Sequence, residues 1–395
     1  MSNQSPISNL QSPTPDPHSL LSGCVAFTQR LIQTPSMPGE EAAIAALIAA
    51  EMEQLGFDEV WQDEIGNVYG RLHGQDRSLP ALVLNTHLDH VDPGDPALWP
   101  VPPYSGEVVG GHVVGRGAVD IKGPLAVQVY SMGGLLRQGE RPRRDVVFTG
   151  VVEEEVGGAG AVYWVEHLDY PVAVIVLGEP SGNNLSLGHR GMLAMWVTFP
   201  GRSVHASVPD KGDNPNYALA TFLQRLQTAR AELSSHPLLG KTTVAPTIVE
   251  VDTKSMNVTP AWTRVLLDFR TSSESPHSLG RFVQRVAGEL AHTLRGAYDN
   301  APVDDSQEPI AGFYTPPESE VVQRARAAIG RGMGREPALT SYRFATDGRH
   351  FVPYDIPIVG YAPGEEEQAH TAGERVAIAA LEEGLQGYMQ LLREF

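Results

Sequence analysis

Four short, almost purely apolar runs place the strongest constraint on how this chain can fold. They are ALVLN (81–85), VVFTGVV (146–152), VAVIVLG (172–178) and IPIVGYA (356–362). Near-continuous apolar runs bounded by turn-forming residues are typical of strands that are buried on both faces. Stretches with apolar residues at helical spacing, such as 124–139 and 161–168, lie between several of these runs. The alternation predicts an α/β domain with a helix-covered, mixed but largely parallel sheet.

The middle of the chain has a different order of predicted elements. A strand is expected at 192–199, an amphipathic helix at 214–233, two strands within 242–260 and 261–272, and a second helix at 278–294. Strand–helix–strand–strand–helix is typical of a small α+β domain of the split βαβ, ferredoxin-like type. Two domains also suit a chain of 395 residues, which exceeds the usual size of a single core.

These patterns predict a discontinuous first domain and an inserted second one. We place the first domain at 18–187 and 308–395 and the inserted domain at 188–307. Residues 1–17 are polar and rich in Pro and Ser, so we expect a flexible N-terminal arm.

Composition excludes several classes of partner. The chain carries 29 basic and 47 acidic residues, a formal charge of −18, which argues against binding to phosphate backbones. It has no apolar run near the roughly 20 residues that a membrane-spanning helix needs, and its start lacks the pattern of a signal peptide. The single cysteine, Cys24, cannot form an intramolecular disulfide. We therefore expect a cytoplasmic protein that binds neither nucleic acid nor membranes.

Residues that commonly bind metal ions follow the apolar runs. They are His87 and Asp89, Glu153 to Glu155, Glu179 and His370, and a glycine-rich segment adds Asp120. Any one of these acids alone would more often be a helix cap or a solvated loop residue. In an open α/β sheet, however, ligands bind at the carboxyl ends of the strands, so clusters at these positions converge. Three adjacent carboxylates also raise one another's pKa unless a cation neutralises them. The pattern favours a metal site.

Six segments together resemble a known family. They are HLDHVDPGDPALWPVPPYSG, GRGAVDIKG, EEEVGGAG, GEPSG, GRSVHASVPDKGDNPNYA and AHTAGE. In this order they are similar to the M20 family of metallopeptidases and deacylases, which includes acetylornithine deacetylase, succinyl-diaminopimelate desuccinylase, aminoacylase and glutamate carboxypeptidase. The resemblance extends from about residue 22 to the C-terminus. It implies a zinc-exopeptidase-like catalytic domain and an inserted lid or dimerisation domain.

The resemblance also implies a set of metal ligands. Asp120 would bridge two Zn²⁺ ions, with Co²⁺ or Mn²⁺ as possible substitutes. His87 and Glu179 would complete one site, and Glu155 and His370 the other. Two such ions about 4 Å apart polarise a carbonyl and lower the pKa of water toward 7.

Catalytic and substrate-binding roles follow from the same resemblance. Glu154 would be the general base, and Asp89 would orient the imidazole of the first metal ligand. Glu153 stands where the family usually has Asp, and we assign it no role. His205 of the inserted domain would stabilise the oxyanion. Asn257, Arg270 and Gly364 would contact the substrate, with the guanidinium suited to a carboxylate.

The resemblance therefore implies a dinuclear metal-dependent amidohydrolase that cleaves an N-acyl amino acid and is a homodimer through the inserted domain. A metallo-dipeptidase or carboxypeptidase acting on short peptides with a free carboxylate is the alternative. A non-catalytic relative would be expected to have lost the base, but Glu154 is present. A nucleotide-binding enzyme is rejected, since GGHVVGRG lacks the phosphate-binding glycine spacing directly after a strand.

Overall fold

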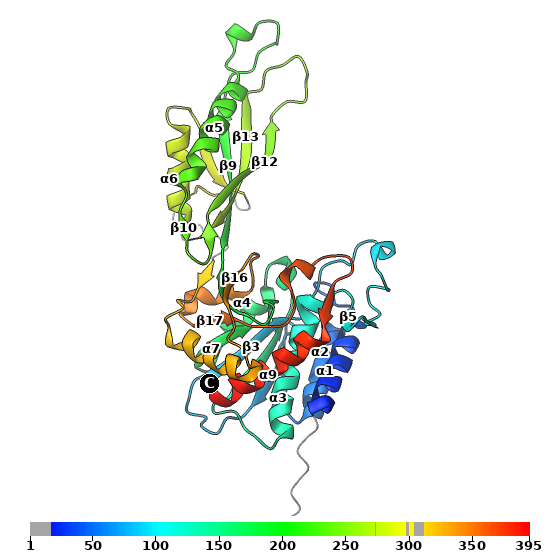
Figure 1. Ribbon diagram of the computed structural model, residues 1–395. Helices are drawn as coiled ribbons and strands as arrows, with labels where there is room; N and C mark the ends of the chain where they lie inside the picture. Colours follow the sequence, from blue (N-terminus) through cyan, green and yellow to red (C-terminus); the bar gives the residue numbers. More distant parts are fainter. Residues whose placement is uncertain (1–16, 273, 298–299, 304–311) are drawn as a thin grey trace, which may run out of the picture. The chain divides into compact units, whose positions relative to one another are not determined.

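The computed structural model describes residues 17–272, 274–297, 300–303 and 312–395 (Figure 1). The chain forms two compact units: unit 1 contains Met1–Leu185, Glu318–Ala338 and Val359–Phe395, and unit 2 contains Ser186–Pro317 and Leu339–Ile358. The expected arm at 1–17 lies outside the described residues except for Pro17, and so does the expected boundary at 307–308. Unit 2 includes Leu339–Ile358, a segment that the sequence-based division assigns to the first domain.

Unit 1 is built on a mixed sheet whose strands follow the order β1-β2-β6-β3-β7-β17. The strands are β1 (Glu59–Gln62), β2 (Val68–Leu72), β3 (Ala81–His87), β6 (Val146–Val151), β7 (Val172–Leu177) and β17 (Ile358–Gly360). β3 pairs in parallel with β6 and with β7, while β2 pairs antiparallel with β1 and β6. All seven residues of β3 are buried, as expected for a central parallel strand. The four apolar runs are therefore strands of one mixed sheet, which confirms the predicted fold class.

Six helices accompany this sheet. They are α1 (Pro17–Ile32), α2 (Ala42–Leu55), α3 (Gly123–Arg137), α4 (Ala159–Glu166), α7 (Glu320–Met333) and α9 (Ile378–Glu394). Helices α1, α3, α9 and α7 pack in that order, each against the next. Helix α2 ends at Gly56, whose φ of 86° is accessible to glycine, and its N–H bonds back to the last turn. A three-stranded sheet, β18-β5-β4, adds β4 (Val108–Val109), β5 (His112–Val114) and β18 (Arg375–Ala377).

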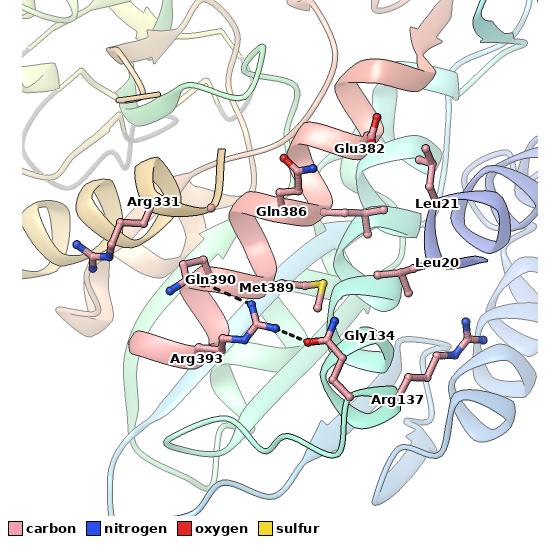
Figure 2. A pocket seen from close by; sticks show the side chains of 13 residues that line it. Leu20, Leu21, Gly134, Arg137, Arg331, Glu382, Gln386, Met389, Gln390 and Arg393 are labelled. Atoms are coloured by element: carbon pink, nitrogen blue, oxygen red, sulfur yellow. Dashed lines mark hydrogen bonds between the residues drawn. The ribbon is translucent and has the colours of Figure 1, made fainter. Parts of the chain in front are cut away.

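A cavity of about 370 Å³ lies among α1, α3, α7 and α9 (Figure 2). Apolar side chains, including those of Leu20, Leu21 and Met389, line part of it. Arg393 lies at one side and donates to Gln138 and Gln390. None of the predicted site residues lines this cavity, so we assign no catalytic role to it.

Unit 2 contains a four-stranded antiparallel sheet with two helices. In chain order the elements are β9 (Gly191–Pro200), α5 (Pro215–Ala229), β12 (Thr243–Val251), β13 (Trp262–Thr271), α6 (Pro276–Ala287) and β14 (Thr293–Gly296). The sheet order is β12-β13-β9-β14, and α5 packs against β9, β13 and α6. Apolar side chains of the helices and strands, among them Phe199, Phe222 and Phe269, form one core cluster. This is the predicted split βαβ arrangement.

The second predicted helix of this domain is too long. The prediction covers 278–294, but α6 ends at Ala287, and Thr293–Gly296 forms β14 against β9. Gly288 follows α6 with a φ of 59°, and its N–H bonds to the carbonyl of Gln284, so the chain leaves the helix there. The helix was predicted too long because apolar residues continue at helical spacing beyond this glycine, although a glycine often ends a helix.

The other strands and the third helix described in unit 2 are short. They are β8 (Leu185–His189), β10 (Ser235–His236), β11 (Gly240–Lys241), β15 (Phe313–Tyr314), β16 (Leu339–Tyr342) and α8 (Gly348–Phe351). Among the described residues of both units, no helix combines the length and apolarity that crossing a bilayer requires.

Candidate metal centre

Three of the predicted ligands follow neighbouring parallel strands. His87 is the last residue of β3, and Glu179 lies two residues beyond the end of β7. Glu155 lies in a single 3₁₀ turn, Glu154–Val156, shortly after β6. Because β6, β3 and β7 are parallel neighbours, their carboxyl ends meet at one edge of the sheet.

The other two ligands come from loops. Asp120 lies in a turn, Ala118–Lys122, directly before α3, and His370 follows a 3₁₀ turn at Glu366–Gln368. One oxygen of Asp120, Oδ1, is 3.0 Å from Nε2 of His87. The other, Oδ2, is 3.1 Å from Nε2 of His370. Asp120 therefore stands between the two imidazoles.

Two further carboxylates complete the cluster. Oε1 of Glu155 is 3.0 Å from Nε2 of His370, and Oε1 of Glu179 is 3.9 Å from Nε2 of His87. Ligand atoms of His87, Asp120 and Glu155 all lie within 4.8 Å of one another. The structure thus brings together all five side chains that the resemblance implies as ligands.

The imidazoles and carboxylates of the cluster shift one another's pKa strongly. Burial opposes protonation of His87, but its contacts with Asp120 and Asp89 raise its pKa well above the usual value. Contacts with Asp120 and Glu155 raise the pKa of His370 to about 10. Burial would raise the pKa of Asp120, yet the two imidazoles hold it well below its usual range. The carboxylates of the cluster therefore stabilise positive charge at this position.

The donor set fits divalent metal ions. Two imidazole nitrogens and three carboxylates converge, and mixed nitrogen and oxygen ligation suits Zn²⁺. Nδ1 of His87 faces away from the cluster and lies 3.2 Å from Oδ1 of Asp89. A carboxylate behind an imidazole fixes the ring so that its other nitrogen points at the metal. The residues present therefore fit a metal site.

The three consecutive glutamates are held through their backbone. Oδ1 of Asp89 accepts the N–H of Glu154 at 3.1 Å, and Oδ2 accepts the N–H of Glu155 at 3.0 Å. Oε1 of Glu41 accepts the N–H of Glu153 at 3.1 Å, and Glu153 has a φ of 59°. Asp89 thus orients one ligand and also fixes the loop of the proposed base.

Sequence reasoning missed Glu41. It is the N-cap residue of α2, and because carboxylates are common at a helix N-terminus, nothing in the sequence distinguished it from an ordinary helix-start acid. Its 4% exposure and its bond to the glutamate loop appear only in three dimensions.

Gly364 lies beside the ligand-bearing turn. It is buried with a φ of 101°, and a Cβ added there would be 3.0 Å from Cγ1 of Val119, the neighbour of Asp120. Its carbonyl accepts the N–H of Gly182 at 2.8 Å. The position therefore requires glycine both for conformation and for space.

We expect Gly364→Ala to lower the free energy of unfolding by about 1–3 kcal/mol, since alanine meets both an unfavourable φ and a close contact. Urea unfolding of the metal-free protein measures this. Gly139→Ala is the matched control, because Gly139 has a φ of 70° but no atom within 4 Å of an added Cβ. An equal loss in both variants would show that the contact with Val119 contributes nothing.

The predicted residues of the inserted domain all lie in unit 2. His205 and Asn257 are close together, with 3.5 Å between Nε2 of the imidazole and Nδ2 of the amide. Nδ1 of His205 lies 2.7 Å from Oγ of Ser207. Arg270 is at the other end of β13 and forms an ion pair with Asp268 at 2.9 Å. Unit 2 therefore groups His205 with Asn257 and leaves Arg270 apart.

Comparison with known proteins agrees with this geometry. Residues 83–394 match the family model for peptidase family M20/M25/M40. The chain is 30% identical to a succinyl-diaminopimelate desuccinylase of a Methylobacterium species, over 91% of this chain and 92% of that protein.

Solved structures share the fold. The crystal structure of the aminopeptidase PepT from Bacillus cereus superposes with a TM-score of 0.73 at 18% identity, covering 95% of this chain and 98% of that one. The YXEP protein of Bacillus subtilis, described as a dinuclear metal-binding peptidase from the M20 family, has a TM-score of 0.67 at 16% identity, covering 95% and 98%. The match to the family model and the relationship to the desuccinylase show that the protein is a hydrolase of amide bonds. It belongs to peptidase family M20/M25/M40.

Proposed function

We propose that this protein is a dinuclear zinc-dependent amidohydrolase that releases the free amine from an N-acyl amino acid. The observation that carries the proposal is the position of Asp120, whose two oxygens each lie about 3 Å from a different imidazole. A carboxylate with a nitrogen ligand on either side suits a bridge between two metal ions. His87 with Glu179 would hold one ion, and His370 with Glu155 the other.

Bound Zn²⁺ would supply Lewis acidity that polarises the amide carbonyl and acidifies water. Glu154 takes the proton from the attacking water and later gives it to the leaving amine nitrogen. Asp89 keeps Glu154 in place through the backbone amide of that residue. His205 stabilises the oxygen that becomes negative when the carbonyl is attacked, and Arg270 binds the substrate carboxylate.

The acyl group is the second part of the proposal. A relative that covers 91% of this chain is named for desuccinylation, and this supports an N-acyl, specifically N-succinyl, substrate. Peptidase names among the solved structures support the alternative, a metallopeptidase that cleaves short peptides with a free carboxylate. Both reactions need the same attack on an amide carbonyl, so the metal centre does not distinguish them.

A substrate panel tests the proposal. Zinc-loaded protein is assayed for amine release from N-succinyl-diaminopimelate, N-acetyl-ornithine, other N-acyl amino acids, and di- and tripeptides. We expect activity on N-acyl amino acids that disappears on chelation and returns when zinc is restored. Turnover of peptides alone would favour the peptidase. Activity that survives complete metal removal would contradict the metal-dependent reaction itself.

Unit 2 supports a homodimer. Strand β12 is at the edge of its sheet. Three of its apolar residues are largely exposed to solvent: Ile248 is 46% exposed, Val249 56% and Val251 40%. Exposed apolar edge strands are unusual in monomers because they pair with other chains.

A second observation also supports a dimer. Asn257 precedes β13 and Arg270 is near its end, so the strand separates them by roughly 25 Å at about 3.3 Å per residue. One substrate carboxylate cannot contact both residues of the same unit.

We therefore propose that His205 and Asn257 serve the site of the partner subunit. Mixing Glu154→Ala with His205→Ala tests this, because each variant alone has no complete site. Exchange of subunits in a two-fold dimer would give half heterodimers with one complete site each, or about a quarter of the parent activity. If His205 serves its own subunit, the mixture stays as inactive as the separate variants.

A further inference from the structure

A buried carboxylate outside the predicted ligand set binds the turn that carries Asp120. Glu374 is 0% exposed, and both of its oxygens accept hydrogen bonds. Oε1 accepts the backbone N–H of Val119 at 2.8 Å and that of Asp120 at 3.0 Å. Oε2 accepts the N–H of Gly117 at 3.1 Å and Nη1 of Arg116 at 2.5 Å. Four donors from one short segment thus converge on a single side chain.

Glu374 also belongs to the loop of another proposed ligand. It follows His370 by four residues and directly precedes β18, which pairs with β5. The N–H of Gly115 bonds to the carbonyl of Glu374 at 3.0 Å, so backbone and side chain of this residue hold the same segment. The loop that carries His370 and the turn that carries Asp120 are therefore fastened to each other through Glu374.

Arg116 extends this connection to a third segment. Its guanidinium lies 5.3 Å from the ring of Trp99 and donates to the carbonyl of Asp92 at 3.3 Å. Arg116 is itself 3% exposed, so its charge and that of Glu374 compensate each other away from water. Removal of either partner would leave an unpaired buried charge.

We propose that Glu374 is a positioning residue of the metal centre, which sets the place of Asp120 relative to His370 so that one carboxylate reaches both imidazoles. Three of the four donors are backbone amides of the turn that carries Asp120, including that residue's own, so the Glu374 carboxylate fixes the backbone at the ligand itself. The inference rests on the proposed metal-dependent function. Beyond that function, the inference assigns a role to Glu374: this residue would affect activity by changing the affinity for metal ions, not by contacting the substrate.

Glu374→Gln is the informative variant. Its amide oxygen can still accept from Val119 and Asp120, but its –NH₂ would face two donors, Arg116 and the N–H of Gly117. We expect metal affinity to fall about 10–100-fold, as is typical when a group that supports metal ligands is lost. At limiting zinc, kcat should fall while KM changes little, and excess zinc should restore much of the loss.

The measurement is zinc affinity by competition with a chromophoric chelator, together with zinc stoichiometry and circular dichroism of the metal-free protein. Glu382→Gln is the matched control, since Glu382 is exposed on α9 and has no recorded partner among the described residues. If Glu374→Gln does not fold, Glu374→Asp takes its place, because it keeps the buried charge but is too short to reach all four donors.

Each outcome decides the inference. Weaker zinc binding in the folded Glu374 variant, with an unchanged control, supports it. Zinc affinity equal to that of the control overturns it, even if the melting temperature falls, and leaves the metal-dependent function intact. A parent protein that binds no zinc overturns both this inference and the proposed function.

Discussion

Glu154→Gln should lower kcat by about 10²–10⁴-fold, the usual contribution of a general base, while the protein keeps its metal ions and its KM. Glutamine has the shape of glutamate but cannot accept the proton of the attacking water. The backbone N–H that Asp89 binds is unaffected, so the loop should keep its conformation. Steady-state kinetics and zinc stoichiometry on the same preparation measure the two quantities.

The neighbouring residue provides the control. Glu153→Gln makes the same chemical change one position earlier, where the structure shows a backbone bond to Glu41. We expect this variant to retain most of the parent's kcat. Loss of zinc from Glu154→Gln would make Glu154 a metal ligand rather than the base. Equal losses of kcat in both variants would indicate that the acidity of the whole loop matters.

Four strands of the sheet, β3, β6, β7 and β17, could be predicted from sequence because most of their residues are buried and apolar. ALVLN, within Ala81–His87, contains no outward polar position, and the structure buries the whole strand. The helix Gly123–Arg137 was likewise predictable, because the stretch 124–139 has apolar residues at helical spacing. At Gly288 the prediction was wrong. The apolar residues continue at helical spacing past this glycine, so a longer helix was predicted, whereas the chain turns there.

Convergence of the ligands was predictable for a topological reason. His87, Glu155 and Glu179 follow adjacent parallel strands, whose carboxyl ends necessarily share an edge. His370 follows the fourth apolar run at a greater distance, after a further turn, so the same argument covers it less directly. Asp120 comes from a glycine-rich loop that follows none of the four runs, and only the resemblance to a family indicated that it joins the others.

The supporting carboxylates could not be predicted in this way. Glu41 and Glu374 act on backbone amides, which every residue has, so no complementary residue type marks their partners in the sequence. Glu374 stood within the segment AHTAGE that carried the resemblance, yet nothing in its neighbours indicated a bond to the turn at 117–120. Such contacts join segments that are distant in the sequence, so they can be identified only from the three-dimensional structure.

Asp120→Asn should have the largest effect on metal content, because this side chain faces both imidazoles. Replacement removes the negative charge and turns one oxygen, 3.0 or 3.1 Å from a histidine nitrogen, into an –NH₂ group that cannot bind a cation. We expect at least one zinc ion per chain to be lost. Activity should fall about 10³-fold or more, since the Lewis acidity of the site is worth several kcal/mol.

Zinc stoichiometry after dialysis and kcat with excess zinc test the prediction. Asp169→Asn is the control, because Asp169 is an exposed acid of the same unit that belongs neither to the ligand cluster nor to the residues that hold it. If Asp120→Asn keeps both ions and loses only kcat, Asp120 tunes the reaction without holding metal. If Asp120→Asn loses zinc while Glu154→Gln does not, then Asp120 binds the metal and Glu154 transfers the proton. The second outcome is expected, because Asp120 contacts both histidines while Asp89 holds Glu154 from behind.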